Sequence, residues 1–171
     1  MKKGGVGGHL TKTGLRFEEI IDISKALDSL ENYKIEGDKL IKNSKPIAEL
    51  HSKHELYRFL EGKGVEHEKL ISKKLLPDIA VLIYKTKTFF IFEIKYQEVE
   101  GSTDEKLQTC DFKIKQYKKL IQIPLGYKVK YVYILNDWFK KPRYKDVLDY
   151  IKSISGCDYL FNKVPAEYLG L

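Results

Sequence analysis

The chain has 171 residues, of which 43% are hydrophobic and 32% charged, and its 31 Lys and Arg against 24 Asp and Glu give a net charge of +7. This composition excludes disordered and fibrous proteins, and the length fits one domain spanning residues 1–171. The sequence has no apolar run long enough to span a membrane, no signal-peptide pattern and only two cysteines, so we expect a cytoplasmic protein without membrane contact.

The positive charge is concentrated in two segments. Residues 1–16 contain four basic residues and no acid, and residues 128–145 contain six basic residues and one acid. Such segments attract polyanions, of which nucleic acid is the natural candidate, and a solvated lysine-rich surface is an equally weighted alternative. We expect the glycine-rich residues 1–12, which include Lys12, to form a flexible arm that becomes ordered on DNA.

The first part of the chain predicts a helix followed by short strands. Apolar residues recur at near-helical spacing from about Thr13 to Leu30, which indicates a helix. Turn-forming residues divide residues 33–50 into segments typical of short strands, with a hairpin among them. Residues 52–60 predict a short helix that ends at Gly62 and Gly64.

Residues 78–95 predict an antiparallel hairpin. Two apolar segments, Asp78–Tyr84 and Thr88–Lys95, are separated by the three residues Lys85–Lys87. Both segments are apolar on both faces, which is typical of central strands covered on two sides. Alternation in the second segment places four residues on one face: Phe89, Ile91, Glu93 and Lys95.

The rest of the chain predicts a helix, a strand and a closing helix. A capping box at residues 102–105 precedes an apolar stripe that runs from Leu107 to Ile121 and includes Cys110 as a packing residue. Residues 128–135 predict a buried strand, parallel to the preceding one because a long helix crosses over to it, and residues 144–154 a closing amphipathic helix. This order predicts an α/β (α+β) fold with a mixed β-sheet core flanked by helices.

Charged residues at the end of the hairpin are exceptional in this plan. Glu93 and Lys95 end a strand that is otherwise apolar on both faces, and buried charges require compensation. An even-length loop or a bulge places Asp78 opposite Glu93 or Lys95 on the same face, whereas a three-residue loop places it opposite Ile94 on the wrong face. The first geometry gathers two carboxylates and a lysine into the oxygen-rich environment that Mg²⁺ prefers.

These residues resemble a known family. Pro77-Asp78, followed after 14 residues by Glu93-Ile94-Lys95, resembles the motif of the PD-(D/E)xK nucleases, the superfamily of many type II restriction endonucleases, archaeal Holliday-junction resolvases and RecB-type exonucleases. The order of elements from residue 13 to residue 136 is similar to the core of that family, which implies a restriction-endonuclease-like fold. Residues 98–108 look like the segment after the catalytic lysine in restriction-type members.

The resemblance implies a role for each matching position. Asp78 and Glu93 would ligate Mg²⁺, with the backbone carbonyl of Ile94 completing the inner shell. Lys95 would orient the attacking water and stabilise its hydroxide form, which agrees with the electrostatics of an ammonium beside a metal. The implied activity is that of a type II site-specific deoxyribonuclease, a Mg²⁺-dependent endonuclease acting on double-stranded DNA. A homodimer or a partner subunit is expected, because one such site cuts one strand.

Glu18 is the least specific of these matches. Within Gly14-Leu-Arg-Phe-Glu18 it looks like the first-helix glutamate of the family, which would act through a metal-bound water or a second metal. It lies on the polar side of the expected helix, where Glu19 competes for the same role. A solvated first-turn glutamate, stabilised by the helix dipole, is the alternative interpretation.

Other basic, aromatic and histidine residues are further candidates for nucleic-acid or metal binding. Tyr131 and Tyr133 alternate with lysines and fit either the core or stacking on bases. The histidines are His9, His51, His54 and His67. Of these, His51 and His54 are spaced to share a helical face, but a third zinc ligand is absent, so we expect surface histidines. Loops within residues 33–70 and 136–145 would supply specificity. We expect six basic residues to contact nucleic acid: Lys12, Lys106, Lys113, Lys140, Lys141 and Arg143.

Two alternative functions are compatible with the same residues. The first keeps the chemistry and changes the substrate, as in a Holliday-junction resolvase or a repair nuclease that needs a branched DNA structure. The second is a nucleic-acid-binding module without catalysis, in which Asp78, Glu93 and Lys95 form a structural ion-pair cluster.

Overall fold

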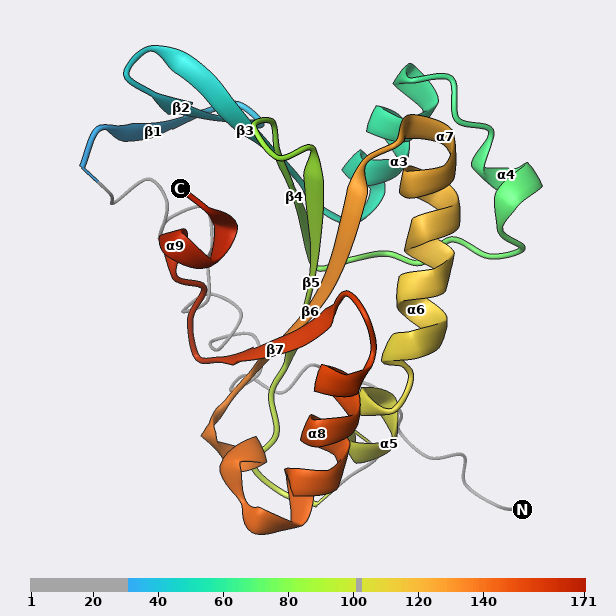
Figure 1. Cartoon of the computed structure of the whole chain (residues 1–171), viewed down its shortest axis with the longest axis vertical. Helices are drawn as coiled ribbons and strands as arrows, with labels where there is room; N and C mark the ends of the chain where they lie inside the picture. Colours follow the sequence, from blue (N-terminus) through green and yellow to red (C-terminus); the bar gives the residue numbers. More distant parts are fainter. Residues whose placement is uncertain (1–30, 101–102) are drawn as a thin grey trace, which may run out of the picture.

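Within residues 31–100 and 103–171, which the computed structural model describes, seven β-strands form one mixed sheet whose strand order follows the chain (Figure 1). Strands β1 to β5 pair antiparallel, and β6 and β7 run parallel to β5. The predicted mixed-sheet α/β fold class is confirmed. The strands are β1 (Tyr33–Glu36), β2 (Lys39–Lys42), β3 (Lys45–His51), β4 (Ile79–Ile83), β5 (Thr88–Lys95), β6 (Lys128–Leu135) and β7 (Cys157–Phe161).

Helices cover both faces of this sheet, as Figure 1 shows. One face packs against α3, α6 and α8, and the opposite face packs against the C-terminal α9. The helices are α3 (Lys53–Gly62), α4 (His67–Leu70), α5 (Thr103–Leu107), α6 (Cys110–Tyr117), α7 (Ile123–Leu125), α8 (Lys145–Ser153) and α9 (Ala166–Leu169), with a π-helical turn η1 (Lys118–Gln122) and 3₁₀ turns η2 (Asp137–Lys140) and η3 (Pro142–Tyr144). In the described part of the chain, each helix is too short or too polar to cross a membrane.

The alternation of β5 divides the core into two layers. Phe89 and Ile91 pack on the side of α3, α6 and α8, whereas Phe90 and Phe92 pack on the side of α9, and all four are at most 3% exposed. Glu93 follows the same alternation and therefore faces the helical layer, as the sequence predicts. This strand is covered on two faces, which is why it reads as a nearly continuous apolar run.

The predicted helix over residues 107–121 is interrupted rather than continuous. Its apolar stripe is buried as expected, but α5 ends at Leu107 and α6 begins at Cys110. The hydroxyl of Thr109 donates a hydrogen bond of 2.7 Å to the carbonyl of Lys106, a local bond that competes with continuation of the helix. Cys110 is fully buried, in agreement with its predicted packing role.

Two elements follow the helix over residues 144–154, with which the predicted order ends. Strand β7 follows that helix and pairs parallel with β6, and α9 packs on the opposite face of the sheet. A five-residue edge strand carries a weak periodic signal, and its parallel pairing depends on the crossover through α8. The prediction that α8 closes the fold was therefore wrong.

The expectation of surface histidines is also wrong for two of them. His51 ends β3 and His67 begins α4, and their exposed fractions are 4% and 2%. His51 and His54 lie on a strand and a helix rather than on one helical face. The helix expected at residues 13–30, the arm at residues 1–12 and the start of the capping box at Ser102 lie outside the described residues.

Candidate active site

A four-residue turn sets the register of the β4–β5 hairpin. Strand β4 ends at Ile83, one residue earlier than predicted, so Tyr84–Lys87 connects it to Thr88, its partner in β5. The loop is thus even in length. The register pairs Ile79 with Phe92, and its continuation places Asp78 opposite Glu93 on the face of the helical layer.

Asp78 is bound to the backbone of the neighbouring strand. Its Oδ2 accepts a hydrogen bond of 2.7 Å from the amide of Ile94. The N–H and C=O of an extended residue face the same neighbour, so the Ile94 carbonyl is also on the Asp78 side of β5. Burial raises the pKa of Asp78, and the Ile94 hydrogen bond and the nearby Lys95 ammonium offset only part of that effect.

Glu93 is the centre of a charged cluster. Its Oε1 lies 2.6 Å from Nζ of Lys95, and Nζ of Lys113 on α6 lies 2.7 Å from Oε1 and 2.6 Å from Oε2. The hydroxyl of Tyr131 donates a hydrogen bond to Oε2. Burial alone raises the pKa of Glu93, but the ammonium groups of Lys95 and Lys113 outweigh burial and lower that pKa to about 2. Glu93 is therefore ionised at neutral pH.

The segment that precedes Asp78 is held by hydrogen bonds from two helices. The hydroxyls of Tyr57 on α3 and Tyr117 on α6 donate to the carbonyl of Leu75, at 2.9 and 3.3 Å. The amide of Lys53 donates to the carbonyl of Pro77 at 3.2 Å. These bonds fix the backbone immediately before Asp78, so the position of its carboxylate does not depend on β4 alone.

The donor set suits a hard divalent cation. Two carboxylates from adjacent strands and a backbone carbonyl supply oxygen ligands, the type that Mg²⁺ binds with water completing its shell. The charges of Asp78, Glu93, Lys95 and Lys113 cancel, so a bound divalent ion would leave the cluster with two positive charges. Among the described residues no three His, Cys, Asp or Glu side chains gather at one point, and Glu18 lies outside those residues.

The basic loop after β6 emerges at the same end of the sheet. Lys95 pairs with Leu135 in the parallel β5–β6 ladder, so the chain leaves β6 beside the charged cluster. The side chain of Asn136 joins the two strand ends through the backbone of Gln97. Its Oδ1 accepts a hydrogen bond of 3.2 Å from the backbone N–H of Gln97, and its Nδ2 donates one of 2.8 Å to the backbone carbonyl of Gln97. This connection places residues 136–145 next to the candidate site.

The basic side chains of that loop have local partners. Lys140 pairs with Asp137 at 2.7 Å, and Arg143 pairs with Glu100 at 2.5 Å. Nζ of Lys141 lies 3.0 Å from the ring centroid of Trp138. The carboxylates of Asp137 and Glu100 offset two of these positive charges, so the loop presents less net positive charge than its sequence suggests.

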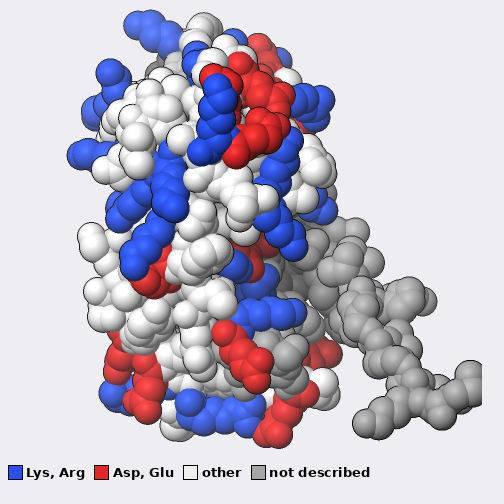
Figure 2. Space-filling view, turned by 90° about the vertical axis from the view of Figure 1, so that its right-hand side faces the viewer, with Lys and Arg blue, Asp and Glu red and all other residues white. Residues whose placement is uncertain are grey.

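The other predicted nucleic-acid contacts lie elsewhere. Lys106 is exposed on α5, whereas Lys113 is only 20% exposed and lies in the charged cluster itself. Lys12 lies outside the described residues. Figure 2 shows Lys and Arg interleaved with Asp and Glu on the helical side of the molecule, rather than a uniform basic surface.

Tyr131 and Tyr133 belong to the interior. Their exposed fractions are 1% and 0%, and their hydroxyls donate to Glu93 and to the carbonyl of Lys106. Both side chains are therefore core residues with polar partners, and base stacking by them is excluded in this conformation. The direct contacts of Tyr131 and Lys113 with Glu93 had no signal in the sequence, because both arise from long-range packing.

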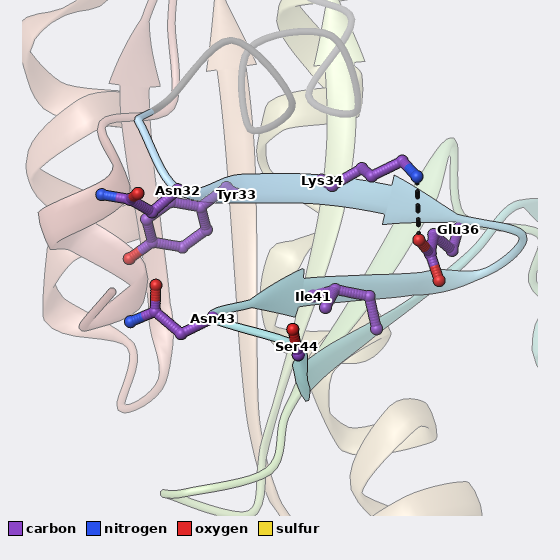
Figure 3. Close-up of a pocket in the computed structure, with 7 residues that line it drawn as sticks. All are labelled: Asn32, Tyr33, Lys34, Glu36, Ile41, Asn43 and Ser44. Carbon is purple, nitrogen blue, oxygen red and sulfur yellow. Dashed lines mark hydrogen bonds and ion pairs between the residues drawn. The ribbon is translucent and has the colours of Figure 1, made fainter.

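A polar groove of about 540 Å³ follows the outer face of β1 and β2 (Figure 3). Figure 3 shows Asn32 and Asn43 at one end and the ion pair between Lys34 and Glu36, 2.9 Å long, at the other. The six residue steps of β3 from Lys45 to His51 separate the Asn43 turn from the charged cluster by roughly 20 Å. The groove is thus distinct from the candidate site.

Comparison of the chain with protein-family models, curated proteins and solved structures found no match in any of the three sets.

Proposed function

We propose that the protein is a Mg²⁺-dependent endonuclease that hydrolyses phosphodiester bonds of double-stranded DNA, of the PD-(D/E)xK type and most like a type II restriction enzyme. The observation that supports this proposal is the juxtaposition of Asp78 and Glu93 on adjacent strands, with Lys95 2.6 Å from Glu93 at the same end of the sheet. Buried charges are costly unless they are paired or bind a metal, so such a cluster is a functional-site candidate.

Each side chain has a defined task in this proposal. Asp78 and Glu93 would hold Mg²⁺ together with the Ile94 carbonyl, and the bound ion would supply a lowered water pKa and neutralisation of phosphate charge. Lys95 orients the attacking water and stabilises its hydroxide form by charge. Glu93 needs no deprotonation before it binds a cation, because its pKa is about 2.

The proposed substrate is a DNA duplex held by basic loops. Lys140, Lys141 and Arg143 lie in the loop that follows β6 at the same end of the sheet as Lys95, so phosphate contacts there would position the duplex over the cluster. The amide side chains of Asn32 and Asn43 suit the reading of adenine. Cleavage of both strands would use a homodimer or a partner subunit.

Cleavage of supercoiled plasmid DNA tests the proposal. We expect the wild type to nick or linearise plasmid with Mg²⁺ and to lose activity in EDTA. Asp78→Asn and Lys95→Ala should lower the cleavage rate at least a hundredfold, since each removes a group of the reacting centre. The matched control is Asp146→Asn, which changes an exposed carboxylate on α8. Equal cleavage by wild type and Asp78→Asn would contradict the proposal.

The products and substrates define the activity further. Discrete fragments with constant ends indicate a restriction enzyme, and sequencing of those ends gives the recognition site and the stagger. A panel of linear duplex, four-way junction and flapped DNA separates this activity from that of a resolvase or repair nuclease, which requires branched DNA.

One observation favours a second candidate, a nucleic-acid-binding module without catalysis. Both oxygens of Glu93 are contacted by ammonium or hydroxyl groups of the chain itself, which is the arrangement of a structural ion-pair cluster. Calorimetry with Ca²⁺ discriminates the two functions. A structural cluster should show no divalent binding that Asp78→Asn abolishes, whereas the nuclease should show it.

A further inference from the structure

The oxygens of Glu93 have no remaining acceptor site. Lys113 contacts both oxygens, Lys95 contacts Oε1 and Tyr131 donates to Oε2, which makes four contacts. An ionised carboxylate offers about four lone-pair positions. A divalent cation therefore reaches Glu93 only if one of these donors leaves.

Lys113 is the donor whose position a cation would take. Its Nζ lies 2.7 and 2.6 Å from the two oxygens, which is the arrangement of a cation bound by both oxygens of one carboxylate. Lys95 contacts Oε1 from the same strand, and Tyr131 is 1% exposed and held in the core. Lys113 extends from α6 on a flexible four-carbon stem and is about as exposed as Lys95, so its contact with both oxygens is what distinguishes it.

We propose that Lys113 is an exchangeable counter-ion, whose ammonium neutralises Glu93 in the metal-free protein and transfers to the substrate phosphate when a divalent cation binds Glu93. This inference rests on the proposed function and assigns a phosphate-contacting role to a helix residue outside the Asp78, Glu93 and Lys95 set. Charge balance supports it. Two carboxylates and two ammonium groups are neutral, and the two charges added by the cation match one phosphodiester and one hydroxide.

The exchange couples the two ligands of the site. Cation binding releases an ammonium for the phosphate, and phosphate binding withdraws the competing ammonium from Glu93, so each ligand raises the affinity of the other. In the metal-free state the same ammonium keeps Glu93 paired, which stabilises the fold before ligands arrive.

Lysine acetylation of the wild-type protein tests the exchange directly. Brief treatment with acetic anhydride, followed by mass spectrometry, reports the accessibility of each ammonium. We expect Ca²⁺ to raise acetylation of Lys113 severalfold, and a short DNA duplex added with Ca²⁺ to lower it again. Lys115 on the same helix, paired with Asp111 at 2.8 Å, is the internal control and should not change. Unchanged reactivity of Lys113 on addition of Ca²⁺ would overturn the proposal.

Calorimetric titration with Ca²⁺ gives a second readout. Lys113→Met should bind Ca²⁺ about tenfold more tightly than wild type without DNA, and DNA should enhance its Ca²⁺ affinity less than in wild type. Lys115→Met should behave as wild type, and Lys113→Arg should return the affinity towards the wild-type value. Equal Ca²⁺ affinity of wild type and Lys113→Met would refute the exchange. Circular dichroism checks that Lys113→Met is folded. If it is not, the acetylation of wild-type Lys113 alone tests the exchange.

The failures of the two proposals are distinguishable. If wild type shows no Ca²⁺ binding that Asp78→Asn abolishes, the proposed nuclease function fails. If that binding exists but neither the acetylation of Lys113 nor the affinity of Lys113→Met responds as stated, only the counter-ion exchange fails.

Discussion

The carboxylate of Asp78 accepts a 2.7 Å hydrogen bond from the backbone amide of Ile94, so the first residue of the charged cluster is joined to the strand that carries Glu93 and Lys95. This bond separates the structural contribution of Asp78 from its proposed ligand role. The oxygen of an amide side chain accepts the same bond, whereas a methyl group does not.

Asp78→Asn should therefore retain most of the stability that Asp78→Ala loses. We expect Asp78→Ala to lower the free energy of unfolding by about 1–3 kcal/mol, because it leaves the Ile94 amide without this acceptor. Asp78→Asn should change it by less than about 1 kcal/mol, since the hydrogen bond persists and burial already raises the pKa of Asp78. Urea unfolding of both variants measures the difference, and equal destabilisation would show that the charge, not the hydrogen bond, matters.

Glu93 and Lys113 should be energetically coupled. Glu93→Gln leaves two partly buried ammonium groups without their counter-charge and should cost about 3–5 kcal/mol of unfolding free energy. Lys113→Met should cost less, because Lys95 and Tyr131 still contact Glu93. The double variant should be more stable than the sum of the single effects predicts, by roughly 0.5–3 kcal/mol. Additive effects in a double-mutant cycle would contradict the coupling.

Stability should fall as the pH is lowered, in two steps. Burial lowers the pKa of His51 below 6.5, so the unfolded chain binds its proton first and stability decreases as the pH falls below 6.5. Glu93 has a folded pKa of about 2 against an ordinary 4.5, so its contribution is complete above pH 4.5 and is lost as the pH falls from 4.5 towards 2. Asp78, with a raised pKa, opposes these steps in part.

A pH series of thermal unfolding midpoints measures these contributions. The variant His51→Phe removes the first step and keeps an aromatic ring beside Phe59, whose centroid lies 4.8 Å from that of His51. Between pH 7 and 5, we expect the thermal unfolding midpoint of His51→Phe to change less with pH than that of the wild type. An identical pH dependence in both proteins would exclude His51 as the source.

Neutralising the loop after β6 should weaken DNA binding. The triple change of Lys140, Lys141 and Arg143 to Gln should flatten the dependence of log affinity on log salt by up to about 0.9 per lost phosphate contact. Because Lys140 and Arg143 already pair with Asp137 and Glu100, we expect fewer than three phosphate contacts to be lost. Fluorescence anisotropy with a labelled duplex in a salt series measures the slope.

The control for that experiment carries the same change in charge on another surface. The exposed residues Lys63, Lys69 and Lys73 lie at the end of α3, on α4 and in the following loop, and their triple change to Gln should leave the slope unaltered. An equal loss of slope in both triple variants would show that total charge, rather than the loop, determines binding.

Gln97 offers a test of the packing beside the site. Its side chain is 5% exposed, and neither its amide oxygen nor its amide nitrogen has a hydrogen-bond partner among the described residues. Methionine has a similar shape without the polar atoms, so Gln97→Met should raise the free energy of unfolding by about 1–2 kcal/mol. The midpoint of thermal unfolding should rise by a few degrees. A lower midpoint would show that the amide is bound in solution.

Local features of the candidate site were predictable from the sequence alone. The alternation of Phe89, Ile91 and Glu93 determines which residues share a face of β5, because the side-chain period of a strand depends on the backbone and not on its neighbours. The same period placed Asp78 opposite Glu93 or Lys95 for an even loop or a bulge, and opposite Ile94 for the three-residue loop Lys85–Lys87. The chain-crossing helix between β5 and β6 likewise predicted their parallel pairing.

The choice between those alternatives came only from the tertiary structure. Whether Asp78 meets Glu93 depends on a single residue at the end of β4, and one residue reverses the face of every side chain in a strand. Lys113 and Tyr131 reach Glu93 from α6 and β6, 20 and 38 residues away, where no local pattern records the contact. The burial that raises the pKa of Asp78 and the ammonium groups that lower the pKa of Glu93 are products of the packed layers and not of the sequence around each residue.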